Sequence, residues 1–157
     1  MIIKINNRKI KFTDELLSDI NRFKQSYLED DEQGGMLIGS VILNTNDVVV
    51  DKVTYPMEGD FFNRVRFIRS LRHNRVLHNI WEKSNFTSMY VGEWHTHPQI
   101  SPVPSSQDIS NWKRLARKSN SDVDTFFFVI VGIEDIGIWY IDRNTLSIEK
   151  IYGGESS

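Results

Sequence analysis

Residues 92–108 read GEWHTHPQISPVPSSQD and hold two of the four histidines in the chain. We predict a strand over Met89–His95, followed by a Pro-rich loop and a helix over Ser105–Lys118. Side chains two residues apart on a strand point to the same face. His95 and His97 are therefore expected to present two imidazoles to one metal ion.

Asp108 stands at the start of the expected helix, where its carboxylate can act as a third metal ligand. Three protein ligands leave one position open. This is typical of catalytic zinc, because a water molecule bound there has a pKa of about 7. The chain has no cysteine, which excludes thiolate zinc sites, iron–sulfur clusters, disulfides and a cysteine nucleophile. We predict one Zn²⁺ per chain, bound by His95, His97 and Asp108.

A hydrolytic zinc site also needs a carboxylate that does not bind the metal and that passes the proton of the attacking water to the leaving amine. Glu32 is our candidate, because it directly precedes the Gly-rich entry into an expected strand, Met36–Leu43. Glu93 is the alternative base, since it shares a strand face with His95 and His97. The other interpretation of Glu93 is a supporting or exposed strand residue.

Two parts of the sequence together resemble the motif of the JAMM (JAB1/MPN/Mov34) metalloprotease family: EQGGMLIG at residues 32–39, and His95-x-His97-x(7)-Ser105-x-x-Asp108. The resemblance implies zinc held by the two histidines and Asp108. It also implies Glu32 as the general acid and base, and Ser105 as a group that stabilises the oxyanion. The family's α/β fold is implied as well.

The GEWHTHP wording at residues 92–98 and the helix around Asp108 to Trp112 are similar to the bacterial JAMM deconjugases of CBASS antiphage operons. This resemblance implies an isopeptidase that cleaves the amide bond after the C-terminus of a ubiquitin-like or E1/E2-conjugated protein. The implied substrate is a conjugated cGAS/DncV-like nucleotidyltransferase, and the implied partners are E1/E2-like ligation proteins of the operon. Two alternatives stay open: a non-catalytic MPN-like scaffold, and a processing protease for a ubiquitin-like or sulfur-carrier protein.

Some of these residues also have a structural interpretation. Ser105 and Asp108 match a capping box at a helix N-terminus, and both roles can hold together. Trp94 and Trp112 flank the proposed site and could line a substrate groove, but aromatic residues at apolar positions more often belong to the core.

The segment Phe61–Lys83 contains neither Gly nor Pro, and its apolar residues recur at helical spacing, so we predict a long helix there. Five arginines make this segment basic and favour a solvated face or a docking surface for an acidic partner: Arg64, Arg66, Arg69, Arg72 and Arg75. His73 and His78 are interpreted as surface residues, because no carboxylate follows them at a ligand spacing.

The rest of the chain alternates strands and helices. A mixed, largely antiparallel sheet flanked by helices is expected, which is an α/β (α+β) fold. An amphipathic helix opens at Thr13 and has its apolar positions as far as Tyr27. The remaining expected strands are Ile2–Phe12, Val48–Tyr55, Phe126–Val131, Ile136–Ile141 and Leu146–Tyr152.

Length and composition set further bounds. A chain of 157 residues with 39% hydrophobic residues predicts one domain over residues 1–157, with 153–157 as a flexible tail. The net charge of -2 gives no strong attraction to nucleic acid or to anionic membranes, and we expect neither as a partner. No signal peptide or membrane span is visible, so we expect a cytoplasmic protein.

Overall fold

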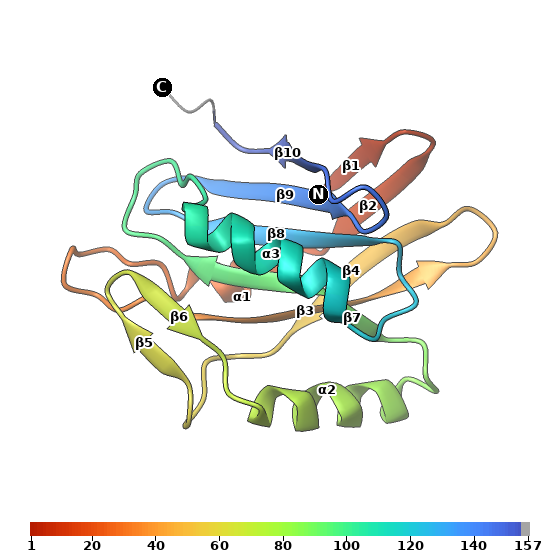
Figure 1. Ribbon diagram of the computed structural model, residues 1–157, viewed down its shortest axis with the longest axis horizontal. Helices are drawn as coiled ribbons and strands as arrows, with labels where there is room; N and C mark the ends of the chain where they lie inside the picture. Colours follow the sequence, from red (N-terminus) through yellow and green to blue (C-terminus); the bar gives the residue numbers. More distant parts are fainter. Residues whose placement is uncertain (155–157) are drawn as a thin grey trace.

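The computed structural model describes residues 1–154, and its main feature is a sheet of eight strands (Figure 1). The strands of this sheet, in chain order, are β1 Ile2–Ile5, β2 Arg8–Phe12, β3 Gly34–Ile42, β4 Asp47–Val53, β7 Met89–Thr96, β8 Thr125–Val131, β9 Ile136–Asp142 and β10 Ile148–Tyr152. Their spatial order is β1-β2-β4-β3-β7-β8-β9-β10. Neighbours are antiparallel except for β2 with β4 and β7 with β8, which confirms the predicted mixed, largely antiparallel sheet.

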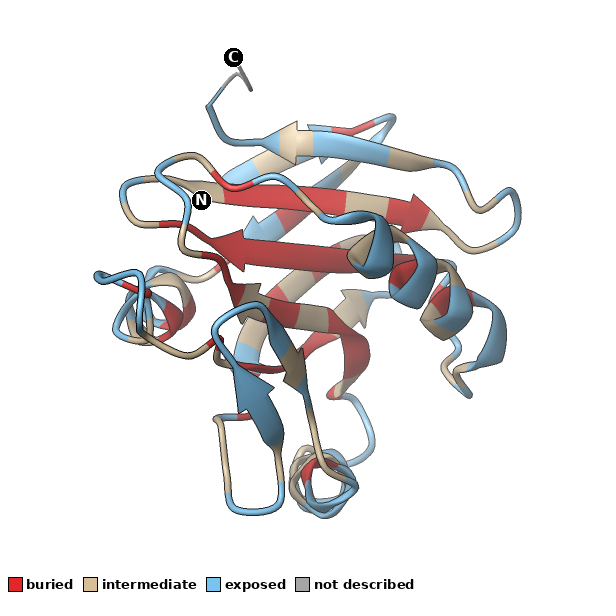
Figure 2. Ribbon diagram, turned by 60° about the vertical axis from the view of Figure 1, so that its left-hand side comes forward, coloured by how far each residue is buried: buried red, intermediate tan, exposed pale blue. Residues whose placement is uncertain are grey.

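Helices cover both faces of this sheet. α1 (Asp14–Asn21) lies behind the sheet in Figure 1 and α3 (Ser106–Lys118) lies in front of it. The turned view of Figure 2 separates them to opposite sides. α2 (Arg72–Lys83) lies beside β3 and β7. The central strand β8 is buried along its whole length, as expected for a strand that is covered on both faces.

The core is rich in aromatic side chains that connect α3 to the sheet. The Trp112 ring stacks on Phe128 of β8, with ring centroids 4.5 Å apart. Trp94 lies 5.5 Å from Phe23 by the same measure. Both tryptophans are buried, as expected for core residues, and both also border a groove on the surface.

The C-terminal end of α3 is fixed by Arg143, which follows β9 in the sequence. Its guanidinium donates hydrogen bonds to four backbone carbonyls at distances from 2.6 to 3.0 Å, those of Ala116, Ser119, Ser121 and Val123. The last carbonyls of a helix have no partner inside the helix, and a cation there also complements the helix dipole. Arg143 therefore holds α3 against the sheet.

The predicted long helix over Phe61–Lys83 is wrong in its first half. Residues 61–68 form a separate hairpin of β5 (Phe61–Asn63) and β6 (Arg66–Ile68), and the helix begins only at Arg72. The Asn63 side chain accepts the amide of Val65 at 2.9 Å and so forms the turn. Of the five arginines, only Arg72 and Arg75 lie in α2, so the five do not share one helix as predicted.

The base of this hairpin is closed by Asp60 and His73. The Asp60 carboxylate accepts hydrogen bonds from the amides of Met57 at 2.8 Å and Ser70 at 2.7 Å. It also lies 2.9 Å from His73 Nε2. His73 Nδ1 lies 2.6 Å from the Thr54 hydroxyl. His73 is fully buried, so the prediction of a surface residue is wrong for it. His78 is exposed as predicted, beside Glu82.

The N-terminal segment differs from the prediction in two places. The single strand expected over Ile2–Phe12 is a hairpin, because Asn6 adopts a φ of 54°, which asparagine tolerates better than most residues. The first helix ends at Asn21 and does not continue to Tyr27. No helix within residues 1–154 is long and apolar enough to cross a bilayer. Of the expected tail 153–157, residues 155–157 lie outside the described residues.

Candidate metal centre

His95 lies at the C-terminal end of β7, between two neighbouring strands, and His97 directly follows β7. His95 is paired with Gly34 of β3 on one side and with Ile130 of β8 on the other. The His97 amide donates to the carbonyl of Val131 at 3.0 Å. The backbone of both histidines is thus fixed by the interior of the sheet, so their side chains start from a defined position.

Asp108 comes from the first turn of α3, and Ser105 is the N-cap of this helix. The Ser105 hydroxyl accepts a hydrogen bond from the Asp108 amide at 3.0 Å, and the Asp108 carboxylate accepts one from the Ser105 amide at 2.8 Å. This is the predicted capping box. The same carboxylate oxygen, Oδ2, faces the two histidines.

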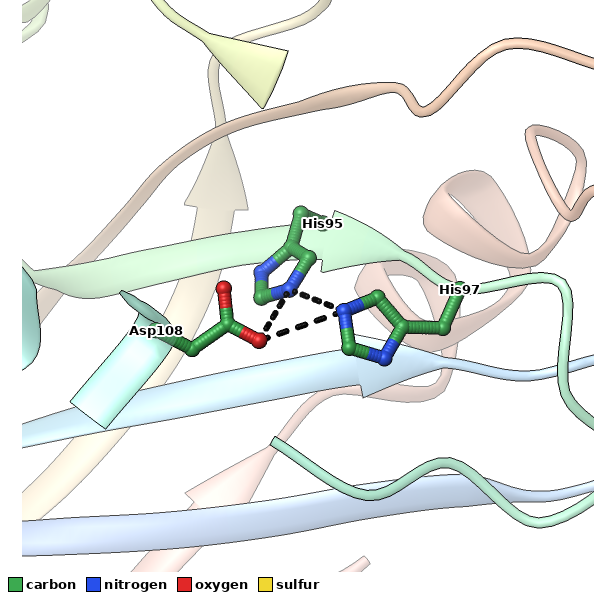
Figure 3. Close-up of side chains that lie close together, drawn as sticks. All are labelled: His95, His97 and Asp108. Carbon is green, nitrogen blue, oxygen red and sulfur yellow. Dashed lines mark hydrogen bonds and ion pairs between the residues drawn. The ribbon is translucent and has the colours of Figure 1, made fainter. Parts of the chain in front are cut away.

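Three ligand atoms from these residues converge (Figure 3). The two Nε2 atoms of His95 and His97 lie 3.0 Å apart, and Asp108 Oδ2 lies 3.4 Å from the first and 3.2 Å from the second. Tetrahedral zinc with bonds of about 2.0–2.1 Å places its ligand atoms about 3.3 Å apart. The spacing and the chemistry of these ligand atoms therefore fit a zinc ion.

The charges at the centre also suit a cation. Burial would raise the pKa of Asp108, but hydrogen bonds from His95 and His97 hold this pKa well below its usual range. Burial would lower the pKa of His97, but the hydrogen bond and charge of Asp108 raise it above its usual value. Asp108 is therefore ionised at neutral pH, as a metal ligand must be.

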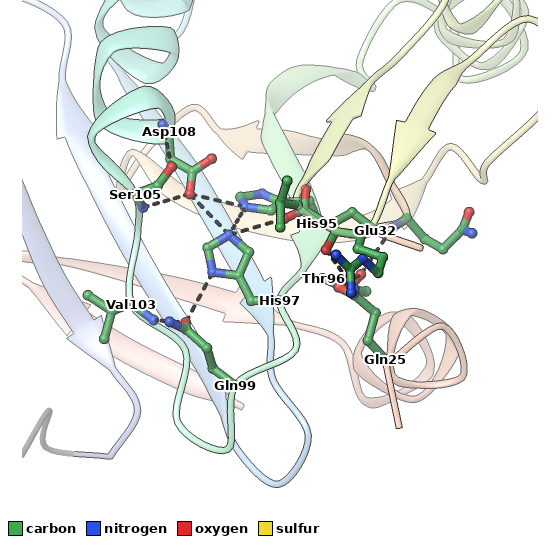
Figure 4. Close-up of polar contacts among 12 residues, drawn as sticks. Gln25, Glu32, His95, Thr96, His97, Gln99, Val103, Ser105 and Asp108 are labelled. Carbon is green, nitrogen blue, oxygen red and sulfur yellow. Dashed lines mark hydrogen bonds and ion pairs between the residues drawn. The ribbon is translucent and has the colours of Figure 1, made fainter. Parts of the chain in front are cut away.

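Gln99 determines which nitrogen of His97 is free for a metal (Figure 4). Its side-chain oxygen accepts a hydrogen bond from the Val103 amide at 2.9 Å and lies 3.2 Å from His97 Nδ1. Because this oxygen can only accept, Nδ1 must carry the hydrogen. The lone pair of neutral His97 then lies on Nε2, the atom that faces His95 and Asp108.

Glu32 reaches the centre from the segment before β3. Its side chain is buried, and Oε1 lies 3.7 Å from His97 Nε2. Its amide donates to the carbonyl of Asn63 at 2.8 Å, so the β5–β6 hairpin helps to place it. Burial raises the pKa of the Glu32 carboxyl from 4.5 to about 7, while the charge of His97 opposes this shift. Such a group can take up and release a proton near neutral pH.

Glu93, the alternative base, lies on the same strand face but is bonded elsewhere. Its Oε1 accepts hydrogen bonds from Arg69 and from the Tyr90 hydroxyl, both at 2.7 Å. The ion pair with Arg69 joins β7 to the chain after β6. The geometry therefore favours Glu32 over Glu93 as the base, and leaves Glu93 as a residue that supports the floor of the site.

Gln25 fixes the segment that carries Glu32, and this role was not predicted from the sequence. Gln25 is fully buried. Its side-chain amide donates hydrogen bonds to the carbonyls of Asp30 and Arg64, and its side-chain oxygen accepts a hydrogen bond from the Thr96 hydroxyl at 2.8 Å. Thr96 Oγ1 in turn accepts the amide of Gln33 at 3.0 Å. No local sequence signal marks Gln25, because its partners lie 5, 39 and 71 residues away.

A groove of about 460 Å³ adjoins the metal centre. Residues of β6 and the following turn form one wall, residues of α3 form the other, and Glu93, Trp94 and His95 line the floor. Glu32, Ser105 and Asp108 also border it. An extended peptide can thus approach the three ligand atoms from the side on which the hairpin and α3 face each other.

The chain matches a known protein family over most of its length. Residues 15–142 match the model of prokaryotic homologues of the JAB domain. In fold, the chain is similar to the solution structure of protein DSY2949 from Desulfitobacterium hafniense, with a TM-score of 0.58 and 18% identity over 90% of this chain and 88% of that one.

Curated relatives are more similar in sequence. The chain is 33% identical over 149 residues to a protein of Pseudomonas aeruginosa, covering 94% of this chain and 86% of the relative. It is 30% identical over 129 residues to a protein of Vibrio cholerae, covering 82% and 79%. Both relatives carry the name CD-NTase/cGAS isopeptidase.

Proposed function

The chain belongs to the family of prokaryotic homologues of the JAB domain, and on this premise we propose that it is a zinc-dependent isopeptidase that releases a conjugated CD-NTase, a cGAS-like nucleotidyltransferase. The observation that carries this proposal is the convergence of His95 Nε2, His97 Nε2 and Asp108 Oδ2 within 3.0 to 3.4 Å, with the buried Glu32 carboxylate beside them. The names of the relatives supply the substrate class.

In this proposal, His95, His97 and Asp108 hold the zinc ion, which as a Lewis acid would polarise the scissile carbonyl and lower the pKa of a water molecule. Glu32 takes the proton of the attacking water on its carboxylate and gives it to the nitrogen of the leaving amine. The buried position of Glu32 beside His97 supports this role, because the proton carrier must lie close to the ligand atoms.

Ser105 is proposed to stabilise the oxyanion that forms on the carbonyl carbon. Its hydroxyl oxygen already accepts the Asp108 amide, so the hydroxyl hydrogen remains available as a donor. A single donor of this kind contributes about 100- to 1,000-fold to the rate in other hydrolases. Ser105→Ala tests this role, and Ser105→Thr is the conservative control.

The proposed substrate is a protein joined through its C-terminal residue to an amine of another protein, which requires E1/E2-like proteins that make the bond. We propose a role in antiphage defence, in which this enzyme reverses the modification. The test uses a CD-NTase together with E1/E2-like proteins that conjugate it to a target amine. The conjugate is prepared, incubated with the zinc-loaded enzyme, and followed by mass spectrometry with and without a chelator.

We expect Glu32→Gln to keep zinc but to lose turnover by about 100-fold or more, because the amide cannot accept the proton. His95→Ala should lose zinc, as measured by elemental analysis.

Glu93→Gln tests the alternative base, and a loss of turnover in this variant alone would move the role to Glu93. Cleavage of linear fusions but not of conjugates would favour a processing protease. Full turnover in the presence of chelator would overturn the proposal.

A further inference from the structure

The two walls of the groove beside the metal centre each carry an exposed arginine. Arg66 lies on β6, and Arg114 lies on α3 across the groove from it. Both side chains are exposed, and within residues 1–154 neither is paired with a carboxylate. Among the residues that the structure describes, Arg114 donates only to the Asn111 side chain, which is uncharged.

The carboxylates that line the groove are all engaged elsewhere. Glu32 and Asp108 belong to the metal centre, and Glu93 is bonded to Arg69. The part of the groove away from the metal centre therefore presents the uncompensated charge of Arg66 and Arg114. This local charge is positive, although the chain as a whole carries a net charge of -2.

The position of Arg114 relates this charge to the reacting bond. Arg114 lies six residues after Asp108 on the same helix, which corresponds to about 9 Å along the helix axis. An extended peptide rises about 3.3 Å per residue. A side chain about three residues from the scissile bond would thus lie beside Arg114.

We propose that this groove selects a substrate whose C-terminal segment carries an acidic side chain about three residues before the scissile bond. Arg66 and Arg114 are the specificity-determining residues. This inference rests on the proposed isopeptidase function, since the segment is placed by its bond at the metal centre. An arginine favours a carboxylate because its planar guanidinium can donate two parallel hydrogen bonds to it.

The test uses the zinc-loaded full chain and three peptides that differ at one position. Each peptide has Asp, Asn or Lys three residues before an amide bond to a reporter amine. We expect kcat/KM to fall about fivefold from Asp to Asn and further for Lys, as exposed ion pairs allow. The preference should shrink at about 0.5 M salt, where charges more than about 4 Å apart are screened.

Matched charge reversals assign the preference to the two arginines. Arg66→Glu and Arg114→Glu should each reduce the preference, and together they should reverse it in favour of Lys. Arg64→Glu in the hairpin turn and Arg117→Glu on α3 are the controls, because both arginines are exposed but do not line the groove. These controls should keep the order Asp, Asn, Lys.

Binding of the same peptides to Glu32→Gln, measured by fluorescence anisotropy, separates this inference from the proposed function. Preferred binding of the Asp peptide without cleavage by the unaltered chain would overturn the function but support the charge preference. Equal values for all three peptides, or no binding of any, would overturn the charge preference. A preference that survives the double reversal would also overturn the assignment to Arg66 and Arg114.

Discussion

A single oxygen atom of Asp108 joins the helix cap to the metal centre. Asp108 Oδ2 accepts the Ser105 amide and also faces His95 and His97. The cap fixes the orientation of the carboxylate, so little conformational freedom is lost when a metal binds. His97 is held in a similar way by Gln99. The ligand atoms are therefore positioned by contacts that do not involve the metal.

We expect Gln99→Leu to weaken zinc binding by about 10- to 100-fold, the usual cost of losing the partner of a ligating histidine. Leucine cannot accept from Nδ1, so His97 is free to place its hydrogen on Nε2 and to rotate. Zinc affinity is measured by competition with a chromogenic chelator, and Gln99→Glu, which keeps the acceptor, should restore tight binding. Ser101→Ala in the same loop is the control, and an equal loss there would contradict a specific role of Gln99.

The residues of the centre were predictable from the sequence to different degrees. His95 and His97 follow from strand geometry, and Asp108 follows from its place at a helix start, so both depend on local structure. The choice of Glu32 depended on the family motif, because the contact with His97 spans 65 positions (97 minus 32). Gln99 and Gln25 act through hydrogen bonds that only the folded chain makes, and no residue pattern predicts them.

At the level of elements, the β5–β6 hairpin and α2 meet at a buried ionisable pair, Asp60 and His73. The predicted helix over Phe61–Lys83 was wrong in its first half, because helical spacing of apolar residues is also compatible with a hairpin whose side chains are mostly exposed. Phe61, Phe62 and Ile68 are all exposed on this hairpin. The boundary between the hairpin and α2 is set by the hydrogen bonds that Asp60 accepts from the amides of Met57 and Ser70. Those contacts depend on tertiary structure.

Asp60→Asn should destabilise the fold in a way that depends on pH. Burial would raise the pKa of Asp60, but the amides of Met57 and Ser70 and the side chain of His73 hold it below its ordinary value of 3.8. A depressed pKa in the folded state contributes stability that is present above the unfolded-state pKa and is lost as the pH falls through the folded-state pKa. We expect a loss of about 1–3 kcal/mol near pH 7.

This loss should become smaller below about pH 4, where Asp60 of the unfolded chain is protonated. Urea denaturation of both proteins between pH 7 and pH 3 measures it. Asp14→Asn is the matched control, since Asp14 is exposed in the first turn of α1 and its side chain lies 3.5 Å from the N-terminal amine. A difference between Asp60→Asn and the unaltered chain that stays constant with pH would contradict the linkage.

At the level of the whole molecule, the centre joins parts of the chain that the sheet order brings together. β7 lies between β3, which follows Glu32, and β8, to which it is parallel. A parallel pair needs a crossover, and α3 provides it, so its first turn passes over the end of β7 with Asp108. The fold class followed from the order of the elements. The three additional strands, which arise where expected segments divide, did not.

Because its ligands come from β7 and α3, a bound metal should stabilise the whole fold. An ion that binds only the folded chain adds about 4 kcal/mol when its concentration is about 1,000 times Kd. For a chain of 157 residues this corresponds to a rise in Tm of about 8–16 °C. Calorimetry of the zinc-loaded chain and of the chain after chelator treatment measures this difference. His97→Ala should show the same Tm in both conditions, because it lacks a ligand. If chelator lowered the Tm of His97→Ala as much as that of the unaltered chain, the stabilising metal would bind elsewhere, and the proposed centre would have to be abandoned.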